Sequence, residues 1–278
     1  MKKIFDHVSA ECSKIVTKRY STSFSLGIQF LSGKLRTPIY AIYGFVRLAD
    51  EIVDTFHDYD KEVLLRKFKR DCFEAIQDGI SLNPVLHSFQ QVVNQYQIDH
   101  ELIELFLNSM EMDLKKETYT PEKYEKYILG SAQVVGLMCL QVFTEGDKAE
   151  YERLKGPAMK LGSAFQKVNF LRDINADYFL LSRTYFPDVD LAKFSNPEKL
   201  KIEEDIAQEF ASALAGIREL PQSSRNGVYL AYTYYQKLFQ KIRNKTAEQV
   251  MQERIRISNF RKLTLMFGAS IRFKTNRL

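Results

Sequence analysis

"FQKVNFLRDINADYFLL", at residues 165–181, has the apolar spacing of a helix but carries charged groups among its apolar residues. Positions three, four and seven residues apart share one face of a helix. The residues on that face are Gln166, Asn169, Asp173 and Asp177. The opposite face is apolar and consists of Phe165, Val168 and Leu171. We therefore predict a buried helix with one polar stripe that ends in two aspartates one turn apart.

The stretch AIYGFVRLADEIVDTF, residues 41–56, repeats this arrangement with a stripe of Tyr43, Arg47, Asp50 and Asp54. Two aspartates in a dry environment would repel each other, and burial would disfavour their charged forms. A divalent cation removes this cost, because it is the largest local charge. Mg²⁺ in particular binds one or two carboxylates together with substrate phosphate oxygens. Two such helices facing each other therefore predict a socket for a metal and a diphosphate.

A pair of aspartates four residues apart is also common on solvated helix faces. Asp58, four residues beyond Asp54, represents this ordinary case, and we interpret it as surface charge at the helix end. The metal interpretation is favoured over a solvated face because both pairs lie on apolar helices and each continues a polar stripe.

The rest of the chain also has helical patterns. Of its 278 residues, 45% are hydrophobic, and Gly and Pro are scarce at 12 and 7, which favours a compact helical protein. Prolines that follow Asn or Thr, as at helix starts, are Pro38, Pro84, Pro121 and Pro197. Neither an internal repeat nor a Gly-, Ser- or Pro-rich linker divides the chain. We predict one all-α domain over residues 1–278, with helices at about 2–18, 37–56, 60–79, 84–96, 99–116, 121–145, 147–180, 197–219, 224–244 and 246–267.

Several classes of protein do not fit this sequence. Three cysteines without metal-like spacing indicate free thiols in a reducing compartment. The N-terminal segment contains acids and lacks the pattern of a secretory signal. No segment reaches the roughly 18 consecutive apolar residues of a spanning helix. We expect a cytoplasmic protein, at most peripheral on the inner face of the cell membrane.

The charge is unevenly distributed along the chain. Residues 251–278 hold seven Lys or Arg and one acid, Glu253, whereas the whole chain has a net charge of +5. Such a tail suits anionic lipid, diphosphate or nucleic acid. Because no aromatic and basic motif of an RNA-binding module is present, we expect no nucleic acid partner. The pattern leaves the oligomeric state open.

At the two stripes the sequence resembles the squalene/phytoene synthase family. The resemblance runs from about Ser21 to Leu263 and rests on YSTSFSLG (20–27), YGFVRLADEIVD (43–54), YILGSAQVVGLM (127–138) and GSAFQKVNFLRDINAD (162–177). It implies an isoprenoid synthase-type helical bundle around a central cavity. It also implies that two prenyl diphosphates are joined head to head, through an allylic cation and a cyclopropylcarbinyl diphosphate, in a cavity that keeps water away from cations.

The resemblance implies roles for single residues. The metal ligands, for Mg²⁺ or Mn²⁺, would be Asp50, Asp54, Asn169, Asp173 and Asp177. The catalytic set would be the four aspartates with Arg47, which binds diphosphate, and Tyr43. The residues in contact with substrate would be Ser21, Phe24, Arg47, Tyr127, Val135, Gly136, Gln166, Tyr235 and Arg254.

Three local features of the matched segments bear on these roles. The small residues Gly130, Ser131, Ala132 and Gly136 fit either close helix packing or room for a prenyl chain, bounded by Tyr127, Val135 and Leu137. Asp113 lies where the family often has another acid. The pair Asp50-Glu51 replaces the more frequent pair of aspartates, and we expect Glu51 to have little effect because it lies off the stripe.

The function implied first is the condensation of two geranylgeranyl diphosphates to phytoene, without NADPH. The alternative is the condensation of two farnesyl diphosphates to dehydrosqualene or, with NADPH, to squalene. The sequence lacks a Gly-rich nucleotide fingerprint, but this favours the reductant-free products only weakly. A non-catalytic interaction protein of the same fold would be expected to lose the four aspartates. A head-to-tail transferase or terpene cyclase would more typically show a D-D-x-x-D motif.

Overall fold

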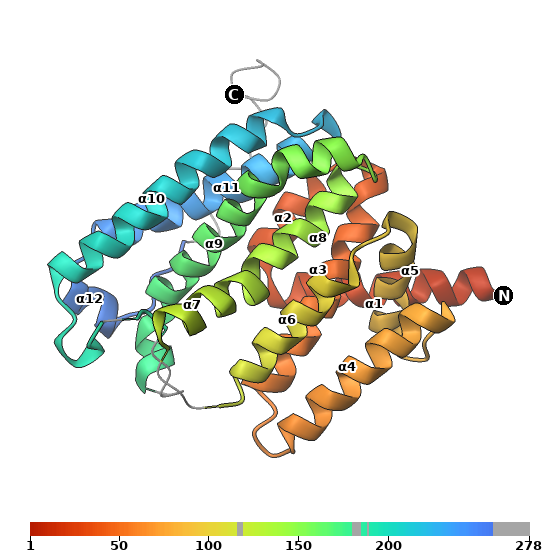
Figure 1. The fold of residues 1–278 in the computed structure, drawn as a ribbon, viewed down its shortest axis with the longest axis horizontal. Helices are drawn as coiled ribbons and strands as arrows, with labels where there is room; N and C mark the ends of the chain where they lie inside the picture. The colour runs from red at the N-terminus through yellow and green to blue at the C-terminus, as the bar shows by residue number, and fades with distance from the viewer. Residues whose placement is uncertain (116–118, 180–184, 188, 258–278) are drawn as a thin grey trace.

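The computed structural model describes residues 1–278 except 116–118, 180–184, 188 and 258–278, and it leaves out the side chains of 22–23, 176–179 and 192. Within this part of the chain every regular element is a helix (Figure 1). The α-helices are α1 (Lys2–Tyr20), α2 (Thr22–Gln29), α3 (Gly33–Asp54), α4 (Lys61–Asp78), α5 (Pro84–Tyr96), α6 (His100–Met112), α7 (Pro121–Ile128), α8 (Val134–Phe143), α9 (Lys148–Phe179), α10 (Asn196–Glu219), α11 (Gln222–Arg243) and α12 (Ala247–Gln252). A π-turn η1 (Leu129–Gln133) joins α7 to α8, and a short 3₁₀ turn η2 (Leu191–Lys193) precedes α10. The all-α prediction is confirmed.

Several helix starts follow the sequence signals. Asn83 caps α5 by accepting hydrogen bonds from the backbone N–H groups of Val85 and Leu86, and Thr120 caps α7 in the same way. Pro38, in contrast, does not begin a helix. It lies inside α3, which already starts at Gly33 after Ser32, so our boundary at residue 37 was wrong.

Two other boundaries differ from the sequence prediction. The helix α2 was missed, because it is short and follows α1 after the single residue Ser21. The helix predicted at 246–267 ends at Gln252, since Glu253 has an extended backbone with φ −139 and ψ 142. Residues 258–267 of that prediction lie outside the described residues.

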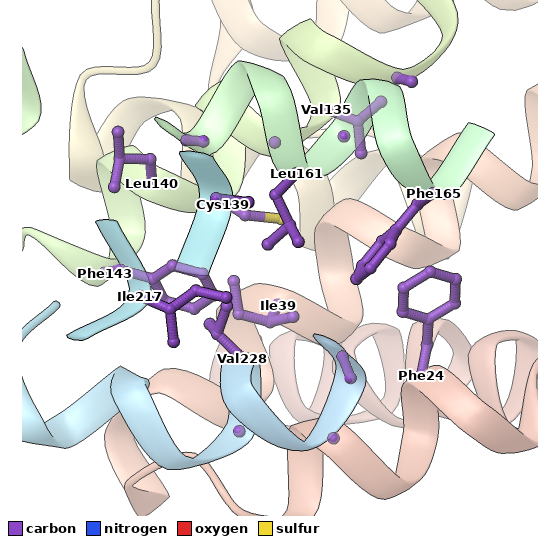
Figure 2. A pocket seen from close by; sticks show the side chains of 18 of the residues that line it. Phe24, Ile39, Val135, Cys139, Leu140, Phe143, Leu161, Phe165, Ile217 and Val228 are labelled. Atoms are coloured by element: carbon purple, nitrogen blue, oxygen red, sulfur yellow. The ribbon is translucent and has the colours of Figure 1, made fainter. Parts of the chain in front are cut away.

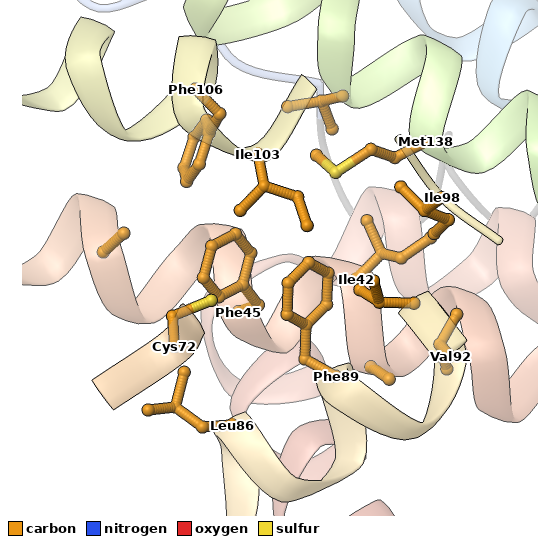
Figure 3. Close-up of a cluster of buried hydrophobic side chains, with 14 of the residues drawn as sticks. Ile42, Phe45, Cys72, Leu86, Phe89, Val92, Ile98, Ile103, Phe106 and Met138 are labelled. Carbon is orange, nitrogen blue, oxygen red and sulfur yellow. The ribbon is translucent and has the colours of Figure 1, made fainter. Parts of the chain in front are cut away.

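The apolar face of α3 is fixed by a buried aromatic cluster (Figure 3). The rings of Phe45 on α3 and Phe89 on α5 stack at a centroid distance of 3.9 Å, and the ring of Phe106 on α6 packs against Phe45 at a centroid distance of 5.5 Å. Phe45 and Phe89 are fully buried. Because Phe45 anchors one side of α3 in this cluster, the stripe that carries Asp50 and Asp54 is turned away from it.

The second stripe belongs to α9, whose apolar face packs against α10 and α11 (Figure 1). Val168 and Leu171 on this face are fully buried. Figure 1 shows α3 to α6 on one side of the bundle and α9 to α11 on the other, with α7 and α8 between them. The two striped helices therefore approach the middle of the bundle from different sides.

The continuous helix Pro121–Phe143 is long and apolar enough by composition to cross a membrane, but 61% of its most apolar window is buried inside the fold. It contains the π-turn η1, a feature that often marks functional sites. Gly130 lies in this turn, where an added Cβ would be only 2.5 Å from the carbonyl oxygen of Leu105. Close packing against α6 therefore accounts for Gly130.

Candidate active site

Two hollow regions meet in the middle of the bundle. One is a polar pocket of about 800 Å³, and the other is an apolar cavity of about 240 Å³ (Figure 2). They share a wall that consists of Phe24, Tyr43, Val46, Ser131, Gln166 and Asn169. A molecule with a charged head and an apolar tail could therefore occupy both regions at once.

The first stripe lines the polar pocket with Asp50 and Asp54 at the end of α3. The guanidinium group of Arg47 forms ion pairs with Asp50 and with Glu51, and it also lies over the ring of Tyr20, 4.4 Å from the centroid. The Nε atom of Arg47 is buried and has no hydrogen-bond partner among the described residues. This group remains available for an acceptor that enters the pocket.

The carboxyl group of Asp50 is in an environment that disfavours its charge. Burial, followed by repulsion from Asp54, raises the pKa of Asp50 to about 7, although Arg47 acts in the opposite direction. Asp113 contributes a smaller repulsion across the pocket. A cation placed between these carboxylates would relieve this cost.

The second stripe lines the other side of the polar pocket, and two of its side chains, Asp173 and Asn169, contact neighbouring polar side chains. Asp173 accepts a hydrogen bond from Nε of Arg172 at 3.0 Å and forms an ion pair with Nε of Arg254 at 2.6 Å. Asn169 accepts a hydrogen bond from the hydroxyl group of Tyr235 at 3.2 Å. Asp177 belongs to the last turn of α9, but its side chain lies outside the described residues.

The donor set fits Mg²⁺ bound together with a diphosphate. Within the described part of the chain, no three acidic, imidazole or thiol groups form a metal-binding cluster by themselves. Mg²⁺ does not need such a cage, since it takes one or two carboxylates, water and substrate phosphate oxygens. The crowded carboxylates of Asp50 and Asp54 match this requirement, whereas Asp173 is neutralised by two arginines.

Comparison with known proteins assigns the family. A sequence model described as squalene/phytoene synthase matches residues 17–261. The chain belongs to the squalene/phytoene synthase family. It is 27% identical to the 15-cis-phytoene synthase of Synechococcus elongatus, over 94% of this chain and 92% of that protein. It is 28% identical to the 4,4'-diapophytoene synthase of Staphylococcus haemolyticus, over 70% of this chain and 67% of that protein.

Plant members of the family are longer. The chain is 26% identical to phytoene synthase 1 of Solanum lycopersicum, over 82% of this chain, and the match spans 59% of the length of the plant protein. Among solved structures, a dehydrosqualene synthase superposes with a TM-score of 0.82 at 20% identity, covering 97% of this chain and 98% of that chain. A squalene synthase from Alicyclobacillus acidocaldarius superposes with a TM-score of 0.75 at 21% identity, covering 87% and 95%. These similarities show an isoprenoid synthase fold.

The structure brings nearly all the residues suggested by the family resemblance to the two hollow regions. Those that line the polar pocket are Ser21, Phe24, Tyr43, Arg47, Asp50, Asp54, Tyr127, Gln166, Asn169, Asp173, Tyr235 and Arg254. Val135 and Gly136 line the apolar cavity, as expected. Tyr127 does not bound this cavity, because it belongs to α7 before the π-turn and lines the polar pocket instead. Leu137 is not a lining residue either, although it packs in one apolar cluster with the lining residues Leu140 and Ile217.

Sequence reasoning missed the hydrogen bonds that hold Asp113. The hydroxyl groups of Tyr127 and Tyr185 donate to this carboxylate at 2.7 and 3.3 Å. Tyr185 stacks on Phe170 of α9 with a centroid distance of 4.0 Å. Tyr185 lies in a non-helical segment without periodicity, so no spacing signal placed it near the site.

Glu51 is absent from the residues that line the polar pocket, in agreement with its place off the stripe, but it has a partner that the sequence did not indicate. It is 8% exposed and pairs with Arg47, because the long arginine side chain reaches around α3. Glu51 and Asp50 together hold the guanidinium group at the pocket wall.

The raised pKa of Asp50 predicts a pH-dependent stability in the metal-free protein. Its unfolded pKa is about 3.9, so between about pH 4 and pH 7 the folded state keeps a proton that the unfolded chain has lost. The free energy of unfolding therefore falls as pH rises through this window. Asp50→Asn should remove the loss and raise the free energy of unfolding at pH 8 by about 1–2 kcal/mol, a value reduced for partial solvent exposure.

Thermal unfolding at pH 4 and pH 8 with a chelator present measures this effect. Asp58→Asn is the matched control, because Asp58 is exposed beyond the end of α3. The raised pKa of Asp50 would be contradicted if both variants changed the free energy of unfolding equally. It would also be contradicted if Asp50→Asn were stabilised only at pH 4.

Proposed function

We propose that this protein condenses two geranylgeranyl diphosphates head to head, through a cyclopropylcarbinyl diphosphate, and releases diphosphate to form phytoene. The observation that carries the proposal is the polar pocket with its two aspartate stripes, which shares six lining residues with the adjoining apolar cavity. Membership of the squalene/phytoene synthase family, whose members are prenyltransferases, supports this type of reaction. The relatives include several proteins named phytoene synthase, which supports the twenty-carbon substrate.

The residues around the polar pocket suit the binding of diphosphate. When bound, Mg²⁺ would act as a Lewis acid that stabilises the departing diphosphate. The residues that would hold Mg²⁺ are Asp50, Asp54 and, once it is released from its two arginines, Asp173. Arg47 and Arg254 would bind phosphate oxygens, because guanidinium groups match their geometry. The Nε of Arg47, which has no hydrogen-bond partner in the part of the chain that the structure describes, is consistent with this role.

The apolar cavity suits the prenyl chain and its cationic intermediates. Its shared wall with the polar pocket contains Phe24 and Tyr43, whose rings lie 4.7 Å apart, and Phe165 stacks on Tyr235 at 3.9 Å. Aromatic faces stabilise positive charge, and an apolar wall keeps water from a carbocation. These rings would therefore protect the cation at the place where the diphosphate leaves.

The alternative substrate is farnesyl diphosphate, which would give dehydrosqualene or, with NADPH, squalene. This alternative is supported by the 4,4'-diapophytoene synthase among the relatives, because its identity to this chain, 28%, is similar to the 27% of a phytoene synthase. The purified protein should be incubated with Mg²⁺ and each diphosphate, with and without NADPH, and the extracted hydrocarbons identified by mass. We expect a forty-carbon hydrocarbon from geranylgeranyl diphosphate without NADPH. A thirty-carbon product alone would favour the alternative, and no product from either substrate would contradict both.

The far end of the apolar cavity predicts a determinant of chain length. Figure 2 shows Phe24 and Phe165 at one side of the cavity and Phe143, Ile217 and Val228 at the other. Val228→Phe should fill this far end and lower the ratio of forty-carbon to thirty-carbon product by at least about tenfold, since one or a few carbons in a pocket change selectivity by roughly 10- to 200-fold. Competition between the two diphosphates measures the ratio.

Val63→Phe on α4 is the matched control for Val228→Phe, because Val63 is 36% exposed and does not line the cavity. An unchanged product ratio in the Val228→Phe variant, with normal folding, would show that the prenyl chain does not reach this end.

A further inference from the structure

The N-terminal helix α1 makes its closest contacts with the bundle through polar residues and leaves three large apolar side chains exposed. The residues that it buries completely against the bundle are small and polar, namely Ser9, Ser13 and Thr17. The close contact of Ser13 with Gly44 of α3, where an added Cβ would be 2.9 Å from Ser13 Cβ, explains why this face is small.

The opposite face of α1 carries Ile4, Val8 and Ile15, which we call the outer stripe. These side chains are 68%, 49% and 56% exposed, and their spacing of four and seven residues places them on one line of the helix. Figure 1 shows the N-terminal turns of α1 extending past the neighbouring helices at the edge of the bundle. Exposed apolar side chains that are gathered on one helix face, rather than scattered singly, indicate an interaction surface.

Basic residues accompany the outer stripe. Lys18 and Arg19 follow Ile15 by three and four residues and lie on either side of the stripe, and Lys14 lies further around the helix on the side of Lys18. The acid on this face, Glu11, is neutralised by Lys14 at 2.8 Å. An amphipathic helix with an apolar line between lysines and arginines fits the interface of an anionic membrane.

We propose that the outer stripe of α1 and its basic neighbours dock the protein on an anionic lipid bilayer. A second protein chain fits less well, because a specific interface usually buries more than about 1,000 Å², far more than the single line of Ile4, Val8 and Ile15 offers. The stripe precedes residue 17, where the match to the family model begins.

The position of α1 connects docking with the active site. Thr17 and Tyr20, in its last two turns, line the polar pocket, and Arg47 lies over the ring of Tyr20. A bilayer that contacts the outer stripe would therefore touch α1, the same helix whose C-terminal turns border the polar pocket. This connection rests on the proposed function, since a prenyl diphosphate and its hydrocarbon product both partition into lipid, whereas the docking itself is tested without substrate.

Co-sedimentation of the full-length protein with vesicles tests the proposal. Vesicles of phosphatidylcholine with phosphatidylglycerol are compared with vesicles of phosphatidylcholine alone. The combined variant Ile4→Ser, Val8→Ser and Ile15→Ser should lower partitioning onto anionic vesicles at least about tenfold, because it removes the apolar contact. Replacing Lys18 and Arg19 by Gln should lower it about fivefold per basic residue. The native protein should bind neutral vesicles weakly.

Matched controls are Leu82→Ser, at a side chain 92% exposed outside α1, and the pair Lys67→Gln and Lys201→Gln on α4 and α10. Both should bind like the native protein, and circular dichroism checks that each variant folds. If the serine variant does not fold, the binding of the charge variant alone tests the proposal. The proposal would be overturned if the α1 variants bound as well as the native protein, or if the native protein did not bind at all. It would also be overturned if the native protein were a dimer that the serine variant dissociates in the absence of vesicles.

Discussion

Asp50→Asn should lower kcat by about 10³-fold while the helix content stays unchanged. Asn keeps the shape of the side chain but loses the negative charge that would hold Mg²⁺ beside Asp54. Electrostatic stabilisation of a departing charged group commonly contributes more to catalysis than any other effect, and the loss of one such contact costs about 10²–10³-fold. Steady-state turnover of geranylgeranyl diphosphate at saturating Mg²⁺ measures kcat, and single-turnover experiments show whether the loss lies in the chemical step.

Asp173→Asn provides an independent test of the second stripe. It should reduce kcat to a similar extent, although Asp173 is paired with Arg172 and Arg254 in the structure. Asp205→Asn is a suitable control, because Asp205 lies on α10 and pairs with Lys167 on the side of α9 away from the pocket. Near-native turnover in both Asp50→Asn and Asp173→Asn would refute the metal assignment.

Arg47→Lys should lower kcat/KM by about 10²-fold, because a lysine cannot replace the planar fork of a guanidinium group that contacts two partners. In the structure Arg47 is held by Asp50 and Glu51, and its Nε remains for a phosphate oxygen. Glu51→Gln should therefore act through Arg47 and lower kcat/KM by about tenfold, mainly through a higher KM.

Inhibition by inorganic diphosphate separates these effects from a loss of folding. Both variants should bind diphosphate more weakly than the native protein, whereas Glu145→Gln, which removes only the exposed pair with Lys34, should not. If Glu51→Gln has native kcat/KM and native diphosphate affinity, Glu51 does not position Arg47, and its place off the stripe describes its role correctly.

The two polar stripes were predictable from sequence because a helix has a fixed period. Asp50 and Asp54 lie four residues apart, so any helix through this segment brings them to one face. The same argument placed Gln166 and Asn169 on one wall of the polar pocket. These inferences needed no knowledge of the tertiary structure beyond the helix itself.

Features that depend on contacts between distant segments were not predictable in this way. Tyr185 reaches Asp113 from an irregular segment, and Arg254 reaches Asp173 after the chain has left α12. The position of Arg254 was suggested only by the family resemblance. The ion pair of Glu51 with Arg47 was not predicted, because helix geometry describes where a side chain begins and does not describe where a long partner such as Arg47 ends.

The π-turn at Leu129–Gln133 divides one long helix into two parts that face different surroundings. Before it, Tyr127 contacts the polar pocket, and after it, Val135 and Gly136 line the apolar cavity. Substitutions in α8 can therefore reshape the space for the hydrocarbon while the residues before the turn keep their contacts with Asp113. Substrate length and diphosphate chemistry would then be separately adjustable in laboratory evolution, although both are encoded within a single helix.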